Sequence, residues 1–149
     1  MQEFKFEFPA NLEFVPIIRV ALQNIAFIFG FNDKEAYEIE FVVDEICNNA
    51  IEHGSKGKDK TITMECKFDK QYVEIMVKDS GSPQFKVDEI LKEGWRLMEE
   101  EAEKQTLNIF RRKRGLIIVQ KYADKLDITS NPNGTIVKIV KKSYRDIKV

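Results

Sequence analysis

The stretch that decides how this chain is interpreted is Asp44–His53, which reads DEICNNAIEH. Glu45 and Asn49 are four residues apart in it, so on a helix their carboxylate and carboxamide share one face. Further along, Asp79-Ser80-Gly81 comes directly after a strand-like run, where a second carboxylate and a tight turn can enter a pocket. Together the two motifs indicate a nucleotide site rather than a generic globular domain.

Length and charge narrow the class of protein. The 149 residues suit one domain spanning 1–149, which can bury a core without disulfides. There are 24 basic and 25 acidic residues, a net charge of −1, which argues against direct binding of nucleic acid or of an anionic membrane surface. No apolar run is long enough to cross a bilayer, and the N-terminus has no signal-peptide core. We therefore expect a cytoplasmic protein.

The cysteines and the histidine point to structural uses. Cys47 and Cys66 lie in apolar or amphipathic segments without CxxC spacing, which favours two reduced core residues. A disulfide between them is the alternative. The only histidine, His53, rules out a site built from several histidines and is interpreted as a helix-end residue.

Hydrophobic periodicity predicts the order of the elements. Alternating phenylalanines predict the first strand, and Gly30 and Gly54 are natural helix stops. The predicted strands lie at about 4–8, 60–68, 72–77, 126–130 and 135–140, and the predicted helices at about 14–29, 33–53, part of 87–112 and 115–122. This order predicts an α+β fold, a two-layer sandwich with a mostly antiparallel sheet and helices on one face.

Four motifs then follow the order of a known family. They are the helix with Glu45 and Asn49, then Asp79-Ser80-Gly81, Arg114-Gly115-Leu116 and Gly134-Thr135. Each motif is weak alone, but their joint order resembles the GHKL ATPase domain, also called the Bergerat fold, over about residues 4–141. The short chain is most similar to bacterial anti-sigma factor serine/threonine kinases. The resemblance implies an ATP- and Mg²⁺-dependent kinase that phosphorylates a small anti-sigma factor antagonist and sequesters a sigma factor. It also implies a homodimer.

The resemblance implies a role for each matching residue. Glu45 matches the general base and Asn49 the Mg²⁺ ligand, since magnesium takes oxygen ligands and few of them from protein. Asp79 matches the adenine reader, whose carboxylate accepts from the exocyclic amine. Gly81 lets the backbone pass close to the base, and Thr135 matches the hydroxyl that supports the aspartate.

The phosphate loop departs from the family pattern. Gly115 matches its last glycine, where amides at a helix N-terminus face anionic oxygens. The family's earlier glycine is replaced by Lys113, which puts closure over ATP in question. The basic run 111–114, which includes Arg114, is interpreted as a replacement source of positive charge for the phosphates.

Other interpretations of these residues remain open. Lys113 favours a non-catalytic partner-switching module with weak or no ATP binding, whereas the intact Glu45 favours an enzyme. A sensor or ATP-hydrolysing domain of a larger machine is a third hypothesis, and a nucleic-acid binder comes last because of the near-neutral charge. Taken singly, Glu45 and Asn49 are also typical of a solvated helix face, and Asp79 of a plain turn.

Overall fold

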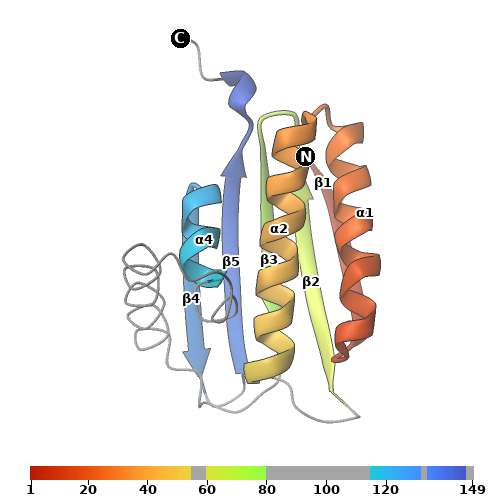
Figure 1. Ribbon diagram of the computed structural model, residues 1–149, viewed down its shortest axis with the longest axis vertical. Coiled ribbons are helices and arrows are strands. Elements are labelled where there is room, and N and C mark those ends of the chain that lie inside the picture. The colour runs from red at the N-terminus through yellow and green to blue at the C-terminus, as the bar shows by residue number, and fades with distance from the viewer. Residues whose placement is uncertain (55–59, 80–114, 132–133, 147–149) are drawn as a thin grey trace, which may run out of the picture.

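The computed structural model describes residues 1–54, 60–79, 115–131 and 134–146. Its sheet has five strands in the order β1-β2-β3-β5-β4, and every neighbouring pair is antiparallel (Figure 1). The strands are β1 (Gln2–Pro9), β2 (Thr61–Phe68), β3 (Tyr72–Lys78), β4 (Lys125–Asn131) and β5 (Gly134–Lys142). The two predicted hairpins are therefore joined into one sheet, because β5 pairs with β3 as well as with β4.

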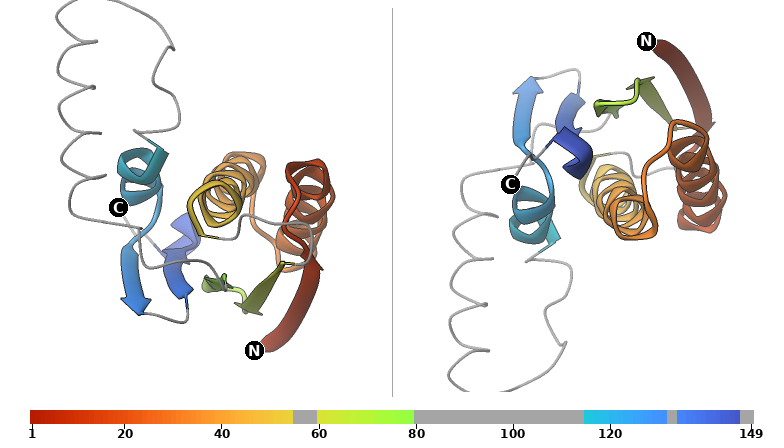
Figure 2. Two further views of the ribbon diagram at one scale, coloured as in Figure 1. Left: turned by 90° about the horizontal axis from the view of Figure 1, so that it is seen from below. Right: turned by 90° about the horizontal axis from the view of Figure 1, so that it is seen from above.

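Three helices cover one face of this sheet, and the other face has no helix among the described residues (Figure 2). They are α1 (Val15–Ile28), α2 (Asp33–Asn49) and α4 (Gly115–Tyr122), with short helical turns at Leu12–Phe14, Ala50–Gly54 and Tyr144–Asp146. The predicted α+β sandwich is confirmed. The predicted loop 55–59 and the predicted helical segment 87–112 lie outside the described residues. None of the described helices is long and apolar enough to cross a membrane.

Local signals set the ends of α1 and α2. Pro16 lies in the first turn of α1, where a backbone N–H has no hydrogen-bond partner within the helix, so proline is tolerated there. Gly30 follows the helix with a φ of 87°, a conformation that favours glycine. Asn32 then caps α2: its side chain accepts from the backbone N–H of Glu35, and the Glu35 carboxylate accepts from the N–H of Asn32, at 2.8 Å each.

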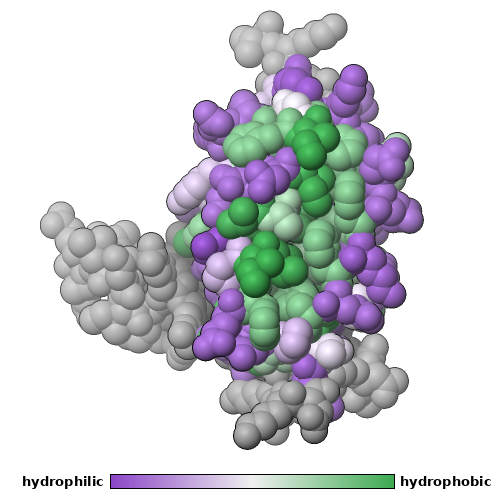
Figure 3. All heavy atoms as spheres, turned by 90° about the vertical axis from the view of Figure 1, so that its right-hand side faces the viewer, coloured by the Kyte–Doolittle hydropathy of each residue, from purple (hydrophilic) through white to green (hydrophobic). Residues whose placement is uncertain are grey.

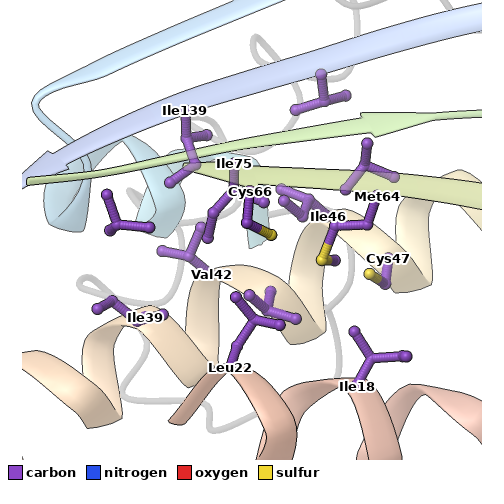
Figure 4. Packing of buried hydrophobic residues seen from close by; sticks show 14 of the residues in the cluster. Ile18, Leu22, Ile39, Val42, Ile46, Cys47, Met64, Cys66, Ile75 and Ile139 are labelled. Carbon is purple, nitrogen blue, oxygen red and sulfur yellow. The ribbon is translucent and has the colours of Figure 1, made fainter. Parts of the chain in front are cut away.

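The core lies between the helices and the sheet. Alternate residues of β2 and β3 are buried, as expected for a sheet with one covered face. Figure 4 shows side chains of α1 and α2 packed against those of β2, β3 and β5. Phe68 anchors one end, with its ring 5.5–6.2 Å from the rings of Phe4, Phe29 and Phe31. Cys47 and Cys66 are buried free thiols, so the reduced interpretation is confirmed and the disulfide alternative is wrong.

A buried ion pair ties the sheet to α2. Lys141, which is 1 % exposed and belongs to β5, lies 2.5 Å from the carboxylate of Glu38 in α2. Lys141 also donates to the backbone oxygen of Tyr122, and the Tyr144 hydroxyl donates to Glu38 at 2.6 Å. This hydrogen bond to Glu38 raises the pKa of Tyr144 to about 12. Buried charges are tolerated only when paired and hydrogen-bonded, as here.

Glu35 forms a second link between α2 and the segment after β5. Its carboxylate accepts from the Ser143 hydroxyl at 2.9 Å and from the backbone N–H groups of Asn32 and Tyr144. Burial by itself raises the pKa of Glu35, but the hydrogen bonds from Asn32, Tyr144 and Ser143 and the charge of Arg145 together lower it below its ordinary value. Both links lie near the N-terminal end of α2, whereas Glu45 and Asn49 lie near its C-terminal end.

Candidate functional site

The C-terminal end of α2 lies near the end of β3 and the start of β5 at the lower edge of the molecule in Figure 1, and the start of α4 approaches α2 where Gly115 meets Glu45. Antiparallel pairing explains this arrangement, because β3 runs toward that edge and β5 starts from it. Five of the predicted site residues belong to these four element ends: Glu45, Asn49, Asp79, Gly115 and Thr135. Gly81, Lys113 and Arg114 lie outside the described residues, so their predicted roles stay predictions.

Glu45 and Gly115 are in close contact although 70 positions separate them in the sequence. A Cβ built on Gly115 would lie 2.0 Å from Oε2 of Glu45 and 2.8 Å from its Cδ. Any side chain at position 115 would displace the carboxylate, so the glycine makes the approach of α4 to α2 possible. The edge-to-face contact of Phe41 and Tyr122, at 5.5 Å, fixes the same helix pair.

Asn49 carries an unsatisfied polar atom. The residue is 5 % exposed, and its side-chain nitrogen has no hydrogen-bond partner among the described residues. An unsatisfied buried group of this kind costs about 1–3 kcal/mol. The unpartnered nitrogen is a donor, and the oxygen of the same carboxamide is the atom that a metal ion would bind. A bound ligand would remove this cost.

Asp79 and Thr135 are joined by two hydrogen bonds. The backbone N–H of Asp79 donates to the oxygen of Thr135 at 3.1 Å, and the N–H of Thr135 donates to Oδ1 of Asp79 at 3.2 Å. The pair therefore closes the ladder between the end of β3 and the start of β5 and orients the Asp79 carboxylate. The backbone N–H of Thr135 supports the Asp79 carboxylate directly, and the role predicted for the Thr135 hydroxyl stays a prediction.

A pocket of about 510 Å³ opens over the outer face of α2. Glu45 and Asn49 contribute to its wall, and Asp79 and Thr135 do not. Its remaining lining residues are Leu12, Val15, Pro16, Tyr37, Phe41, Asp44, Asn48 and Glu52. Arg19 forms ion pairs with Glu40 at 3.1 Å and with Asp44 at 3.3 Å beside this pocket.

Sequence analysis missed the apolar wall of this pocket. Tyr37, Phe41, Glu45 and Asn49 recur every four residues, so they form one stripe along α2. The two aromatic residues were therefore recognisable as neighbours of Glu45. The contribution of Leu12 and Val15 had no such signal, because it depends on the packing of α1 against α2.

The donor set fits a magnesium ion held mainly by a ligand's phosphates. Mg²⁺ prefers oxygen ligands and often takes only one or two from protein, which one carboxamide can supply. The described residues contain no group of three or more His, Cys, Asp or Glu arranged for a metal, so an all-protein metal cage is absent from the described part of the chain.

Comparisons with known proteins agree with this geometry. The family model of the histidine kinase-like ATPase domain matches residues 8–141. A protein named Serine-protein kinase RsbW from Bacillus pumilus (strain SAFR-032) is 32 % identical over 80 residues, which are 52 % of this chain and 49 % of that protein. A second protein of that name, from Bacillus subtilis (strain 168), is 33 % identical over 75 residues, 49 % of this chain and 46 % of that protein. The alignments thus span about half the length of the curated relatives.

Solved structures share the fold at low sequence identity. The RsbU and RsbW domains of Rv1364c from Mycobacterium tuberculosis superpose with a TM-score of 0.64 and 14 % identity, covering 96 % of this chain and 33 % of that one. The SiaB-SiaC complex from Pseudomonas aeruginosa superposes with a TM-score of 0.62 and 14 % identity, covering 93 % and 88 %. At these identities the likeness shows a common fold alone.

Proposed function

Because the chain belongs to the family of histidine kinase-like ATPase domains, we propose that it binds ATP with Mg²⁺ and transfers the γ-phosphoryl group to a protein hydroxyl. The observation that carries the proposal is the contact of Glu45 with Gly115 beside the unsatisfied amide of Asn49. A carboxylate, a metal-binding amide and a pocket that reaches the surface are what a phosphoryl transfer to a partner requires.

Adenine recognition is assigned to the Asp79 end of the site. The amide of Thr135 fixes the orientation of the Asp79 carboxylate, so that it can accept a hydrogen bond from the exocyclic amine. Gly81 would let the backbone pass beside the base. Because the carboxylate is already oriented before the nucleotide binds, less conformational entropy is lost on binding.

The phosphate end is assigned to Asn49, Gly115 and Arg114. The carboxamide of Asn49 would hold the magnesium ion, and the ion would neutralise charge on the phosphates. The amide groups at the start of α4 lie at Gly115, and Arg114 precedes them in the sequence. Lys113 replaces a glycine whose backbone could approach the phosphates closely. Positive charge from Arg114 would take the place of those backbone contacts.

Glu45 is assigned the general base. It would accept the proton of the attacking serine or threonine hydroxyl while Asn49, one turn away, keeps the metal in place. The pocket over α2 leads from the surface to Glu45, and its apolar side chains Tyr37 and Phe41 offer a contact for the protein substrate.

The proposed substrate is a small anti-sigma factor antagonist, and the proposed second partner is a sigma factor that the antagonist displaces. The likeness to proteins named Serine-protein kinase RsbW supports this assignment. Two buried free thiols favour a cytoplasmic location. A non-catalytic partner-switching module is the second candidate, favoured by Lys113 in place of glycine.

Calorimetric titration of ATP, with and without Mg²⁺, tests the nucleotide site. We expect Asp79→Asn to weaken ATP and adenosine alike, and Asn49→Ala to abolish the effect of Mg²⁺ while adenosine binds as before. Asn48→Ala is the matched control, because Asn48 lies in the same pocket and its amide donates to Asp44 instead. If the folded protein fails to bind ATP, the assignment as a kinase is overturned and the non-catalytic partner-switching module is favoured. If ATP binds, Glu45→Gln should lower phosphoryl transfer at unchanged ATP affinity.

A further inference from the structure

The pocket over α2 is lined on one wall by two neighbouring stripes of side chains. One stripe carries the aromatic residues and leads to Glu45 and Asn49. The other is acidic or amide-bearing and recurs every four residues, so it also follows one line along the helix. We define this acidic stripe as Glu40, Asp44, Asn48 and Glu52. All its members except Glu40 line the pocket.

The wall of this pocket is negatively charged. Among the described residues that line it, Asp44, Glu45 and Glu52 carry carboxylates and none carries a basic side chain. Arg19 lies beside the pocket, but its guanidinium is shared between Glu40 at 3.1 Å and Asp44 at 3.3 Å. Four carboxylates and one guanidinium give these described side chains a formal charge of −3. The whole chain carries −1, so negative charge is concentrated here and attracts a cation.

Asp44 has capacity to accept from a ligand. Its side chain is 31 % exposed. Oδ1 pairs with Arg19, and Oδ2 accepts a long hydrogen bond of 3.4 Å from Nδ2 of Asn48. A carboxylate offers about four acceptor positions, so another donor can approach Asp44 from the pocket. The cationic head of a lysine or arginine is such a donor, and its hydrogen bond to a carboxylate is strengthened by charge.

A second, independent observation also points to a ligand in this pocket. Asn49 lines it and is 5 % exposed, and its Nδ2 has no hydrogen-bond partner among the described residues. Because Nδ2 is a donor, the group that satisfies it must be an acceptor, such as a peptide carbonyl or a hydroxyl oxygen. The ligand therefore needs acceptor oxygens as well as positive charge. A basic peptide segment has both.

The other wall of the pocket comes from the start of α1 and is apolar. Leu12, Val15 and Pro16 form it. Figure 3 shows the α1 side of the molecule, where hydrophobic residues gather along the middle between hydrophilic margins. Tyr37, on the α2 wall, is 59 % exposed, so its ring is open to a cation. Lysine and arginine have an apolar stem and a charged head, which suits a pocket with one apolar and one acidic wall.

We propose that the pocket over α2 binds a basic segment of the protein substrate, with cations at Asp44 and Glu52 and an acceptor oxygen at Nδ2 of Asn49. The inference rests on the proposed function, because the hydroxyl that this segment brings to Glu45 is taken as the one that is phosphorylated. Asp44 precedes Glu45 directly, so one basic residue lies beside the acceptor hydroxyl. Asp44 and Glu52 are roughly 12 Å apart along the helix axis. An extended segment spans that length in about four residues, which sets the spacing of a second basic residue.

Fluorescence anisotropy with the full chain tests the proposal in the absence of nucleotide. The probe is a labelled glycine- and alanine-rich peptide with one serine and two lysines four positions apart, placed before or after the serine. We expect saturable binding of at least one lysine peptide, weaker at high salt, and no binding when both lysines are replaced by glutamate. Asp44→Asn should weaken binding by about tenfold or more.

Glu40→Gln is the matched control for Asp44→Asn. It removes the same charge and the other partner of Arg19, but Glu40 is not among the lining residues of the pocket, so peptide affinity should stay close to that of the wild type. Equal losses in the two variants, or equal binding of the lysine and glutamate peptides, would overturn the proposal.

Carbodiimide crosslinking locates the peptide on the wild type and remains informative if Asp44→Asn is poorly folded. The reagent joins a lysine amine to a carboxylate that it contacts, so mass spectrometry should find the peptide on Asp44 or Glu52. Adducts confined to other carboxylates would exclude the pocket. A protein that binds the lysine peptide but no ATP would overturn the kinase and leave a peptide site. A protein that binds ATP but neither lysine peptide would overturn this inference alone.

Discussion

Oε2 of Glu45 lies 2.0 Å from the point where a Cβ of residue 115 would stand, so Glu45 and Gly115 form a contact that only glycine permits. The two residues come from different helices, α2 and α4, and the packing of Phe41 against Tyr122 keeps those helices together. The resemblance assigned Gly115 to a phosphate loop, where amides at a helix N-terminus face anionic oxygens. The structure adds a second reason, which is room for the proposed general base.

Gly115→Ala should therefore impair catalysis as well as stability. The methyl group must push the Glu45 carboxylate aside, at a cost of about 1–3 kcal/mol in the free energy of unfolding. A displaced base should lower turnover by about 100-fold. Urea unfolding and steady-state phosphoryl transfer measure the two effects.

Gly30→Ala provides the control for that variant. Gly30 has a φ of 87°, and an added Cβ would meet Arg145 at 2.7 Å, so stability should fall there too. Gly30 follows α1, next to the N-terminal end of α2, so turnover per folded molecule should stay unchanged. Equal losses of turnover in both variants would mean that Gly115 acts through stability alone.

Asn49→Leu should separate stability from ligand binding. Replacing an unsatisfied buried amide with an apolar side chain removes a desolvation cost, so the free energy of unfolding without nucleotide should stay within about 1 kcal/mol or rise. ATP–Mg²⁺ affinity should fall because the metal ligand is gone. Chemical denaturation with and without ATP–Mg²⁺ gives both values, and Asn48→Leu should retain the stabilisation by ATP. An Asn49→Leu protein that binds ATP–Mg²⁺ normally would contradict the assigned metal ligand.

Glu35 should make stability depend on acid pH. Its folded pKa is below its ordinary value of 4.5, so the unfolded state binds more protons in the interval between the two. The contribution of Glu35 is fully present above the unfolded pKa and is lost as the pH falls through the folded pKa. Denaturation curves across this range should show a shallower pH slope for Glu35→Gln than for the wild type. Identical slopes for Glu35→Gln and the wild type would argue against the hydrogen-bonded carboxylate.

The thiols of Cys47 and Cys66 should be inert in the folded protein. Burial raises the pKa of both thiols, that of Cys66 to about 12, and the thiolate is the reactive form. A chromogenic disulfide reagent should label them only at the rate of unfolding. Asn24→Cys places a thiol at an exposed position of α1 and should react at once. Rapid labelling of the wild-type thiols would show that the core opens locally.

Much of the site could be predicted before any packing was considered. Glu45 and Asn49 share a helix face because of their spacing alone, and Asp79 follows a strand with clear alternation. What could not be predicted is how these residues meet. The contact of Glu45 with Gly115 and the two hydrogen bonds between Asp79 and Thr135 join segments that are 70 and 56 positions apart, and no local pattern records such pairings.

The amino-acid sequence by itself determined the elements of this protein, and the tertiary structure decided their neighbours. Gly30 follows the end of α1 and Asn32 caps the start of α2, and alternating apolar residues predict β2 and β3. These signals can be recognised in the sequence because capping and side-chain direction act within a few residues. Three features depend on surfaces brought together from distant parts of the chain. They are the insertion of β5 between β3 and β4, the burial of Lys141 against Glu38 and the exposure of Ile17 and Ile28 on α1. Charged residues are ordinarily exposed and apolar ones buried, so only the packed structure identifies the residues that break this rule.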